Sequence, residues 1–209
     1  YDAQANDARL SGRAQVGGGL GLRVVSADGK KGIDVLGWIY HRQLADSVPI
    51  EGTIYAGDLD TIDGVPPRSL PIDGRDKTEG GVNVEARWER LSLFGQYVYQ
   101  DLAGLVRKGY EVEAGYRFPL NGLFAVGDQP WFNWVQPAVR VSRIQNDFSA
   151  PAGFAAPSFA WDWTKVDFGV RVGIVRNVDL TAEYARNDMK TKGGVLHPDE
   201  LLVTLRAGF

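Results

Sequence analysis

The last nine residues of the chain, 201–209, alternate between apolar and polar side chains, as an extended strand with two unlike faces requires. One face is entirely apolar and carries Leu201, Val203, Leu205, Ala207 and Phe209. The other face carries Thr204, Arg206 and Gly208 together with Leu202. This pattern is typical of the closing strand of a bacterial outer-membrane β-barrel. A soluble β-sandwich can contain the same strand, so the rest of the chain has to decide between the two folds.

Nearly every other patterned segment also has a period of two residues, and no long amphipathic helix is evident. The sequence predicts about nine strands, near 10–24, 32–42, 81–89, 91–100, 110–118, 135–142, 165–174, 178–186 and 201–209. We therefore expect an all-β chain whose strands form an antiparallel transmembrane β-barrel. Pro137 lies inside one of these segments and cannot donate to a sheet, so we expect a bulge or a locally unpaired site there.

Composition excludes some classes of protein and leaves the barrel open. No run of about 18 apolar residues occurs, which excludes a transmembrane helix. The mean hydropathy of −0.20 does not count against a barrel, because barrel strands alternate. The net charge of −3 gives no case for nucleic-acid binding. The 26 glycines and 23 aromatic residues suit turns, strands and the aromatic girdles of a barrel, and there is no cysteine for a disulfide.

The connections between the predicted strands differ in length in an ordered way. Short turns follow the first, third and seventh strands, whereas long segments follow the second, sixth and eighth. Short periplasmic turns that alternate with longer outer loops are a barrel property, and they make 43–80, 145–163 and 187–198 the predicted outer loops, with a shorter one at 101–108. The connection at 119–131 is longer than a periplasmic turn should be. Aromatic residues also gather near strand ends, so we favour the barrel over a soluble sandwich.

An odd number of strands bears on the domain organisation. Single-chain bacterial barrels generally have an even number of strands with both termini in the periplasm. We therefore expect residues 1–209 to form one outer-membrane barrel domain that lacks upstream strands. On this interpretation the chain is the C-terminal portion of a barrel of about 16–18 strands.

Three segments resemble the outer-membrane porins, most closely the C-terminal part of the phosphate-selective porin O/P family. They are Gly81-Val-Asn-Val-Glu-Ala-Arg-Trp88, Leu91-Ser-Leu-Phe-Gly-Gln-Tyr97 and Gly109-Tyr-Glu-Val-Glu-Ala-Gly-Tyr-Arg-Phe118. Leu180-Thr-Ala-Glu-Tyr184 and the terminal strand fit the same order, so the resemblance covers roughly residues 80–209. It implies a trimer of 16-stranded barrels in the outer membrane, in contact with lipid and lipopolysaccharide. It also implies passive diffusion of small hydrophilic solutes, including anions such as phosphate, but it assigns no substrate-binding residue.

Charged side chains recur on the polar faces of the predicted strands, which a barrel presents to its lumen. The predicted pore-lining residues are Arg13, Arg23, Arg87, Glu111, Glu113, Arg117, Arg140, Lys165, Asp167, Arg171, Glu183 and Arg206. A basic ladder would concentrate anions, because a low-dielectric wall strengthens its field. Since carboxylates share the face, the alternative is a mutually neutralised wall with weak selectivity.

Other functions have weaker support in the sequence. Asp58, Asp60 and Asp63 have oxygen-ligand spacing for Ca²⁺, but the full EF-hand loop is absent and a solvated acidic loop is favoured. His197 near Asp199 is the candidate centre of a barrel hydrolase, although a solvated loop histidine is favoured. We expect no enzyme activity, catalytic residue, metal or cofactor. A closed structural or interaction barrel of a surface assembly remains the main alternative to a porin.

Overall fold

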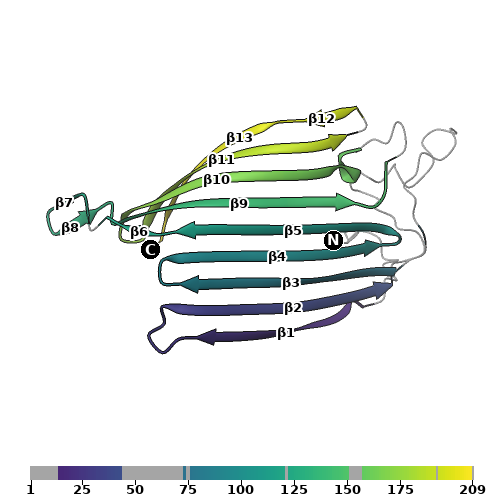
Figure 1. Ribbon diagram of the computed structural model, residues 1–209, viewed down its shortest axis with the longest axis horizontal. Coiled ribbons are helices and arrows are strands. Elements are labelled where there is room, and N and C mark those ends of the chain that lie inside the picture. The colour runs from purple at the N-terminus through teal and green to yellow at the C-terminus, as the bar shows by residue number, and fades with distance from the viewer. Residues whose placement is uncertain are drawn as a thin grey trace.

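The computed structural model describes residues 14–43, 73, 76–120, 122–150, 157–191 and 193–208, which form a single extended antiparallel sheet and a small hairpin (Figure 1). Along the sheet the neighbours are β1, β2, β3, β4, β5, β9, β10, β11 and then β13, with β6 beside β9 and β12 beside β11. The all-β, antiparallel prediction is confirmed. The described sheet is open, because β1 and β13 each pair along one edge only.

The long strands have 9 to 14 residues each. They are β1 (Val16–Val25), β2 (Lys31–Gln43), β3 (Asp76–Trp88), β4 (Leu91–Leu102), β5 (Leu105–Tyr116), β9 (Trp134–Asn146), β10 (Asp162–Val175), β11 (Val178–Thr191) and β13 (Asp199–Ala207). The short ones are β6 (Phe118–Pro119), β7 (Phe124–Val126), β8 (Gln129–Trp131) and β12 (Gly194–Leu196). A short 3₁₀ helix spans Pro157–Ala160, and within the described ranges no helix has the length and hydropathy to cross a bilayer.

The strands extend beyond several of the predicted boundaries. Residues 76–80 belong to β3, and residues 145–146 and 162–163 belong to β9 and β10, so the long connections are shorter than 43–80 and 145–163. The segments 101–108 and 187–198 were expected to be loops, and that was wrong: Ala103–Gly104 is a two-residue turn, and β11 continues to Thr191 before turning into β12. These strand ends carry polar residues on both faces, which hides the alternation on which the prediction depended.

The connection between β5 and β9 contains the hairpin of β7 and β8, which projects beyond the sheet on the side of the short turns (Figure 1). Pairing between β5 and β9 ends at Gly115 opposite Ala138 and resumes in the same register at Phe118 opposite Val135. Pro137 lies in this gap, where no ladder hydrogen bond is needed on that side. Of the two expectations for Pro137, the locally unpaired site is correct, and the bulge occurs instead near Gly173 in the pairing of β10 with β11.

The turn between β1 and β2 is closed by side-chain hydrogen bonds. The Ser26 hydroxyl donates to Asp28 at 2.6 Å, and the Lys30 amide donates to the same carboxylate oxygen at 3.1 Å. These two bonds lower the pKa of Asp28 below its ordinary value, in that order of importance. Because the folded-state pKa is lowered, the contribution of Asp28 to the turn is present at neutral pH and is lost as the pH falls through that pKa.

The two-residue turn between β4 and β5 depends on a glycine. Ala103 and Gly104 both have positive φ, 52° and 86°, and the Gly104 amide donates to Asp101 at 2.9 Å. We expect Gly104→Ala to destabilise the protein by about 1–2 kcal/mol, because an L side chain is strained in this conformation. The added Cβ would also lie 3.2 Å from Asp73. The midpoint of urea unfolding measures the effect, and Gly95→Ala is the control, since a Cβ there meets open space and φ is not positive. Equal midpoints for the two variants would contradict the expectation.

Candidate functional site: two unlike faces of one sheet

The register divides the strands into an apolar and a polar face along the whole sheet. One cross-strand row of the apolar face contains Val24, Ile33, Ala86, Leu93, Ala114, Val139, Phe168, Tyr184 and Leu201. The segment 32–42 has apolar residues on both faces in the sequence, and the register places Ile33, Val35 and Ile39 on the apolar face of β2. The apolar side chains are widely exposed: Leu20 is 89% and Phe168 56% accessible. An apolar face of this extent in contact with water is unusual, and it marks a surface that meets protein or lipid.

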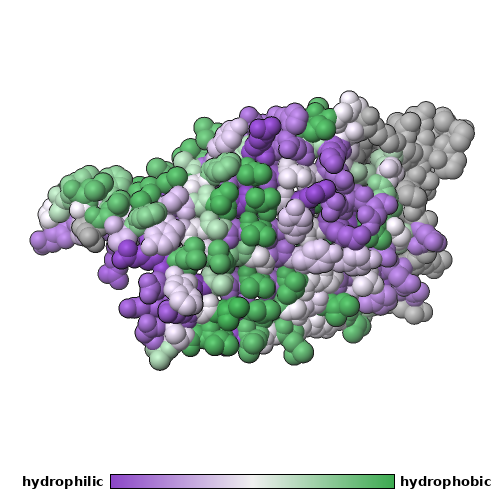
Figure 2. All heavy atoms as spheres, in the orientation of Figure 1, coloured by the Kyte–Doolittle hydropathy of each residue, from purple (hydrophilic) through white to green (hydrophobic). Residues whose placement is uncertain are grey.

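The apolar residues form a band with polar residues on either side. Figure 2 shows hydrophobic residues gathered in a band that crosses the strands, with hydrophilic residues at both ends. On β4 the band extends from Leu91 to Tyr99 on the apolar face. These two residues are eight positions apart, which is about 27 Å of strand. A height of about 25 Å is that of the lipid-facing band of outer-membrane barrels.

Aromatic residues of the apolar face mark the two limits of this band. At the end with the short turns, Trp88 and Tyr116 flank Leu91 in a single cross-strand row. At the opposite end, Tyr110 is the apolar-face neighbour of Lys108 on β5, and Tyr184 is the apolar-face neighbour of Arg186 on β11. One polar-face residue separates the members of each pair. Aromatic girdles at both limits are a property of barrels at the membrane–water interfaces.

The band runs obliquely to the hydrogen-bonded rows. Toward the end opposite the short turns, the first polar residue of the apolar face is His41 on β2 and Asp199 on β13. The cross-strand row that contains Asp199 reaches β2 at Val35, six residues from His41. Six residues correspond to about 20 Å along a strand, and the seven steps from β2 to β13 to about 34 Å across the sheet. The strands are therefore tilted by about 30° from the normal to the band, close to the 35–45° of membrane barrels.

The polar face contains every predicted pore-lining residue that the structure describes. Arg23, Glu113, Arg140 and Asp167 lie in one cross-strand row, and the register places the other seven on the same face. Arg13 lies outside the described residues. In β10 and β11 this face is the more buried one, since Asp167 is 2% and Asp179 8% accessible. Burial is thus inverted relative to a soluble protein, with charge covered and apolar side chains exposed.

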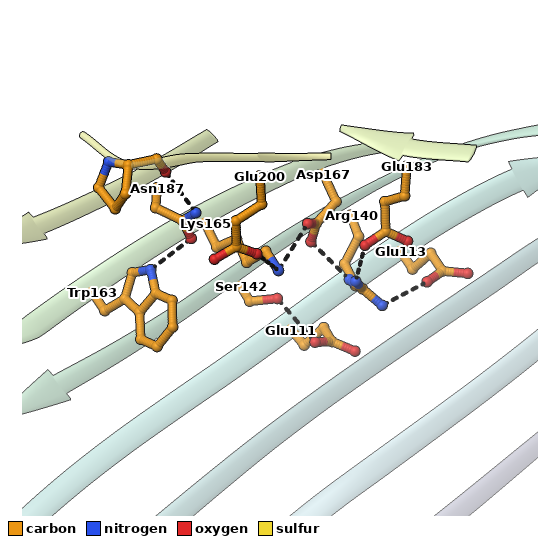
Figure 3. A network of polar contacts seen from close by, with 11 residues as sticks. Glu111, Glu113, Arg140, Ser142, Trp163, Lys165, Asp167, Glu183, Asn187 and Glu200 are labelled. Atoms are coloured by element: carbon orange, nitrogen blue, oxygen red, sulfur yellow. Dashed lines mark hydrogen bonds and ion pairs between the residues drawn. The ribbon is translucent and has the colours of Figure 1, made fainter. Parts of the chain in front are cut away.

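Arg140 is the centre of an ion-pair network (Figure 3). Its Nε donates to Asp167 at 2.9 Å and its Nη2 to Glu183 at 3.0 Å, while Nη1 lies 3.8 Å from Glu113. Lys165 Nζ lies 3.3 Å from both Asp167 and Glu200. These contacts join β5, β9, β10, β11 and β13, so one network ties five strands together. Buried charges of this kind are tolerated because each has an opposite charge and hydrogen bonds.

A second buried group, not identified from the sequence, lies beside this network. Asn187 is fully buried; its Oδ1 accepts from the Trp163 indole at 2.9 Å, and its Nδ2 donates to the Pro198 carbonyl at 2.8 Å (Figure 3). The two bonds connect β10 to β11 and β11 to the junction of β12 with β13. Asn187 appeared to be a loop residue because polar residues surround it in the sequence.

Arginines collect at the end of the polar face that carries the short turns. Arg171 donates two hydrogen bonds of 2.7 Å to Asp179, and Arg206 donates to the same carboxylate at 2.9 and 3.2 Å. Arg117 lies over the Trp134 ring with its Cζ 4.3 Å from the centroid, and the Cζ of Arg171 is 5.5 Å from it. Two guanidinium groups thus share one carboxylate, and a third stacks on the neighbouring indole. Asp179 was not among the predicted pore-lining residues, although it alternates with Thr181 and Glu183.

The described residues place the remaining candidates as follows. His197 Nδ1 lies 2.6 Å from Asp188 Oδ1, so its partner is Asp188 rather than Asp199. The contacts of His197 within the described chain include no hydroxyl that could serve as a nucleophile. Asp58, Asp60 and Asp63 lie outside the described residues, and within those residues no group of three or more metal-ligating side chains occurs.

Comparison of the chain with protein-family models, with curated proteins and with solved structures finds no match. The two faces of the sheet are therefore the basis for assigning a function.

Proposed function

We propose that this chain forms part of the wall of a bacterial outer-membrane porin through which small hydrophilic solutes diffuse passively. The observation that carries the proposal is the inverted burial of the sheet. An apolar band about 25 Å high, limited by aromatic residues at both ends, matches the hydrocarbon layer. The opposite face, with its charged and amide side chains, suits a water-filled lumen. A soluble sandwich would bury the apolar face and expose the polar one.

The edges of the sheet support closure by further strands. Eight antiparallel steps separate β1 from β13, so the two edge strands run in the same direction. An entirely antiparallel barrel can join them only through an odd number of additional strands. Seven or nine additional strands would give the 16 or 18 strands proposed for the complete barrel. Closure also removes two long unpaired edges, which otherwise promote aggregation. The resemblance to the porin O/P family extends this proposal to a trimer.

A closed structural barrel is the second candidate, and the network around Arg140 favours it. Side chains from five strands meet there, and Asp167 is almost inaccessible. If the opposite wall contributes a similar network, the two would fill the lumen and leave no path for ions.

Conductance in a planar lipid bilayer distinguishes these candidates. We expect the purified protein to produce stepwise conductance increments in KCl, because the polar face would line a hydrated path. Heat-modifiable migration in electrophoresis would establish that the sample is folded. Folded protein that leaves the bilayer silent would contradict the porin and favour the structural barrel.

A further inference from the structure

The charges of the polar face are sorted by height along the strands. Six carboxylates lie within the apolar band, in the polar-face row of Asp167 and in the two rows beside it; they are Asp34, Glu85, Glu111, Glu113, Asp167 and Glu183. We call them the carboxylate belt. The same rows also contain a seventh carboxylate, Glu200, and the cations Arg23, Arg87, Arg140 and Lys165, so their described part has a surplus of three negative charges.

The arginines are displaced toward the end with the short turns. Arg87, Arg117, Arg171 and Arg206 all lie there, and Asp179 is the carboxylate that accompanies them. Arg87 itself donates to the Gly29 carbonyl in the first turn at 3.2 Å. The wall is therefore neutral only as a whole. A solute that crosses it would meet a positive zone near the turns and a negative zone farther along the strands.

Pairing leaves several belt carboxylates available to a solute. Arg140 contacts Asp167 at 2.9 Å and Glu183 at 3.0 Å, and Lys165 lies 3.3 Å from both Asp167 and Glu200. Arg23 reaches Asp34 only at 3.8 Å. Glu113 has only the 3.8 Å contact with Arg140, and Glu111 accepts a hydrogen bond from the neutral Ser142 hydroxyl at 2.9 Å. Glu85 is exposed and has no hydrogen bond or ion pair with another described residue. It lines a hollow of about 420 Å³ whose other charged residues are Asp34, Glu113, Arg23 and Arg87, so the carboxylates outnumber the guanidinium groups there by one.

We infer that the carboxylate belt makes this pore prefer small cations over anions, which is the reverse of the preference that the resemblance implies. The inference rests on the proposed function. Carboxylates that lack a close cationic partner in a low-dielectric wall lower the energy of a cation and raise that of an anion. The arginines near the turns act at the mouth, where the pore meets bulk electrolyte and screening is strongest.

The reversal potential under a KCl gradient tests the inference. For the wild-type protein we expect a reversal potential with the sign that excess K⁺ permeation produces. In Glu85→Gln/Glu113→Gln the ratio of K⁺ to Cl⁻ permeability should fall by at least about twofold, because the variant removes one carboxylate that has no partner among the described residues and one that has only a 3.8 Å contact with Arg140, without a change in shape. Glu89→Gln is the matched control, since Glu89 lies in the β3–β4 turn and outside the belt; its ratio should equal that of the wild type.

The outcomes separate the inference from the proposed function. A wild-type reversal potential of the chloride sign would overturn cation preference and leave the porin in place. An unchanged ratio in the double variant would overturn the role of the belt. Folded protein without conductance would overturn both. The sign for the wild-type protein decides the inference even if the double variant fails to fold.

Discussion

Val112→Arg is expected to destabilise the reconstituted protein by about 2–4 kcal/mol, the cost of a guanidinium at the lipid-facing midplane of a barrel. Val112 is 55% accessible, and its cross-strand neighbours on the apolar face are Gly95 and Val141. It lies close to the middle of the apolar band on β5, between Tyr110 and Tyr116, where the new charge would have no aqueous surface within easy reach. In water the same change at an exposed strand position would usually cost less than about 0.5 kcal/mol.

The measurement is urea unfolding of the protein in phosphatidylcholine vesicles, followed by tryptophan fluorescence. Gln96→Arg provides the matched control, because Gln96 lies on the polar face at nearly the same height and pairs across the strands with Glu111. Its new guanidinium would enter an aqueous lumen beside a carboxylate, so we expect a change within about 0.5 kcal/mol. Equal costs for the two variants would mean that the apolar face does not meet lipid, and the membrane assignment would fail.

The sequence was sufficient to predict the division between the two faces in most strands, but not in β2, where both faces carry apolar residues. Alternation with a period of two is a local property, so it placed Glu113, Arg140 and Asp167 on the same side of their strands without knowledge of the pairing. It also located most strand centres, since the apolar band imposes alternation there. Beyond the band polar residues occur on both faces, so several predicted strands ended too early. Asn187 was therefore assigned to a loop, and its hydrogen bonds were not predicted.

Contacts between distant strands could not be predicted in this way. Arg140 and Glu183 are 43 residues apart, and their 3.0 Å contact depends on the register of β9, β10 and β11 together. A shift of one residue in either pairing would turn one of these side chains to the other face. The insertion of β6 to β8 before β9 further separates β5 from its partner. The alternation therefore identified which residues share the polar face, whereas the register decides which charges neutralise one another.

Arg140→Gln is expected to lower the free energy of unfolding by about 3–5 kcal/mol, because it removes one partner from a buried ion-pair network. Asp167 would retain only Lys165 at 3.3 Å, and Glu183 would lose its 3.0 Å partner. Asp167, Glu183 and Glu113 would then lie near one another without the guanidinium that now separates them. The same vesicle unfolding experiment measures the change.

Two further variants distinguish burial from simple charge removal. Arg186→Gln also deletes an ion-paired strand arginine, but its 3.9 Å contact with Asp188 is exposed, so we expect a loss below about 1 kcal/mol. Adding Asp167→Asn to Arg140→Gln should recover part of the lost stability, because the buried carboxylate that lacks a full partner is then neutral. If Arg140→Gln and Arg186→Gln had equal effects, the polar face would have to be solvated around Arg140. The network would then line an open passage and could not close it, which would remove the main observation in favour of a structural barrel.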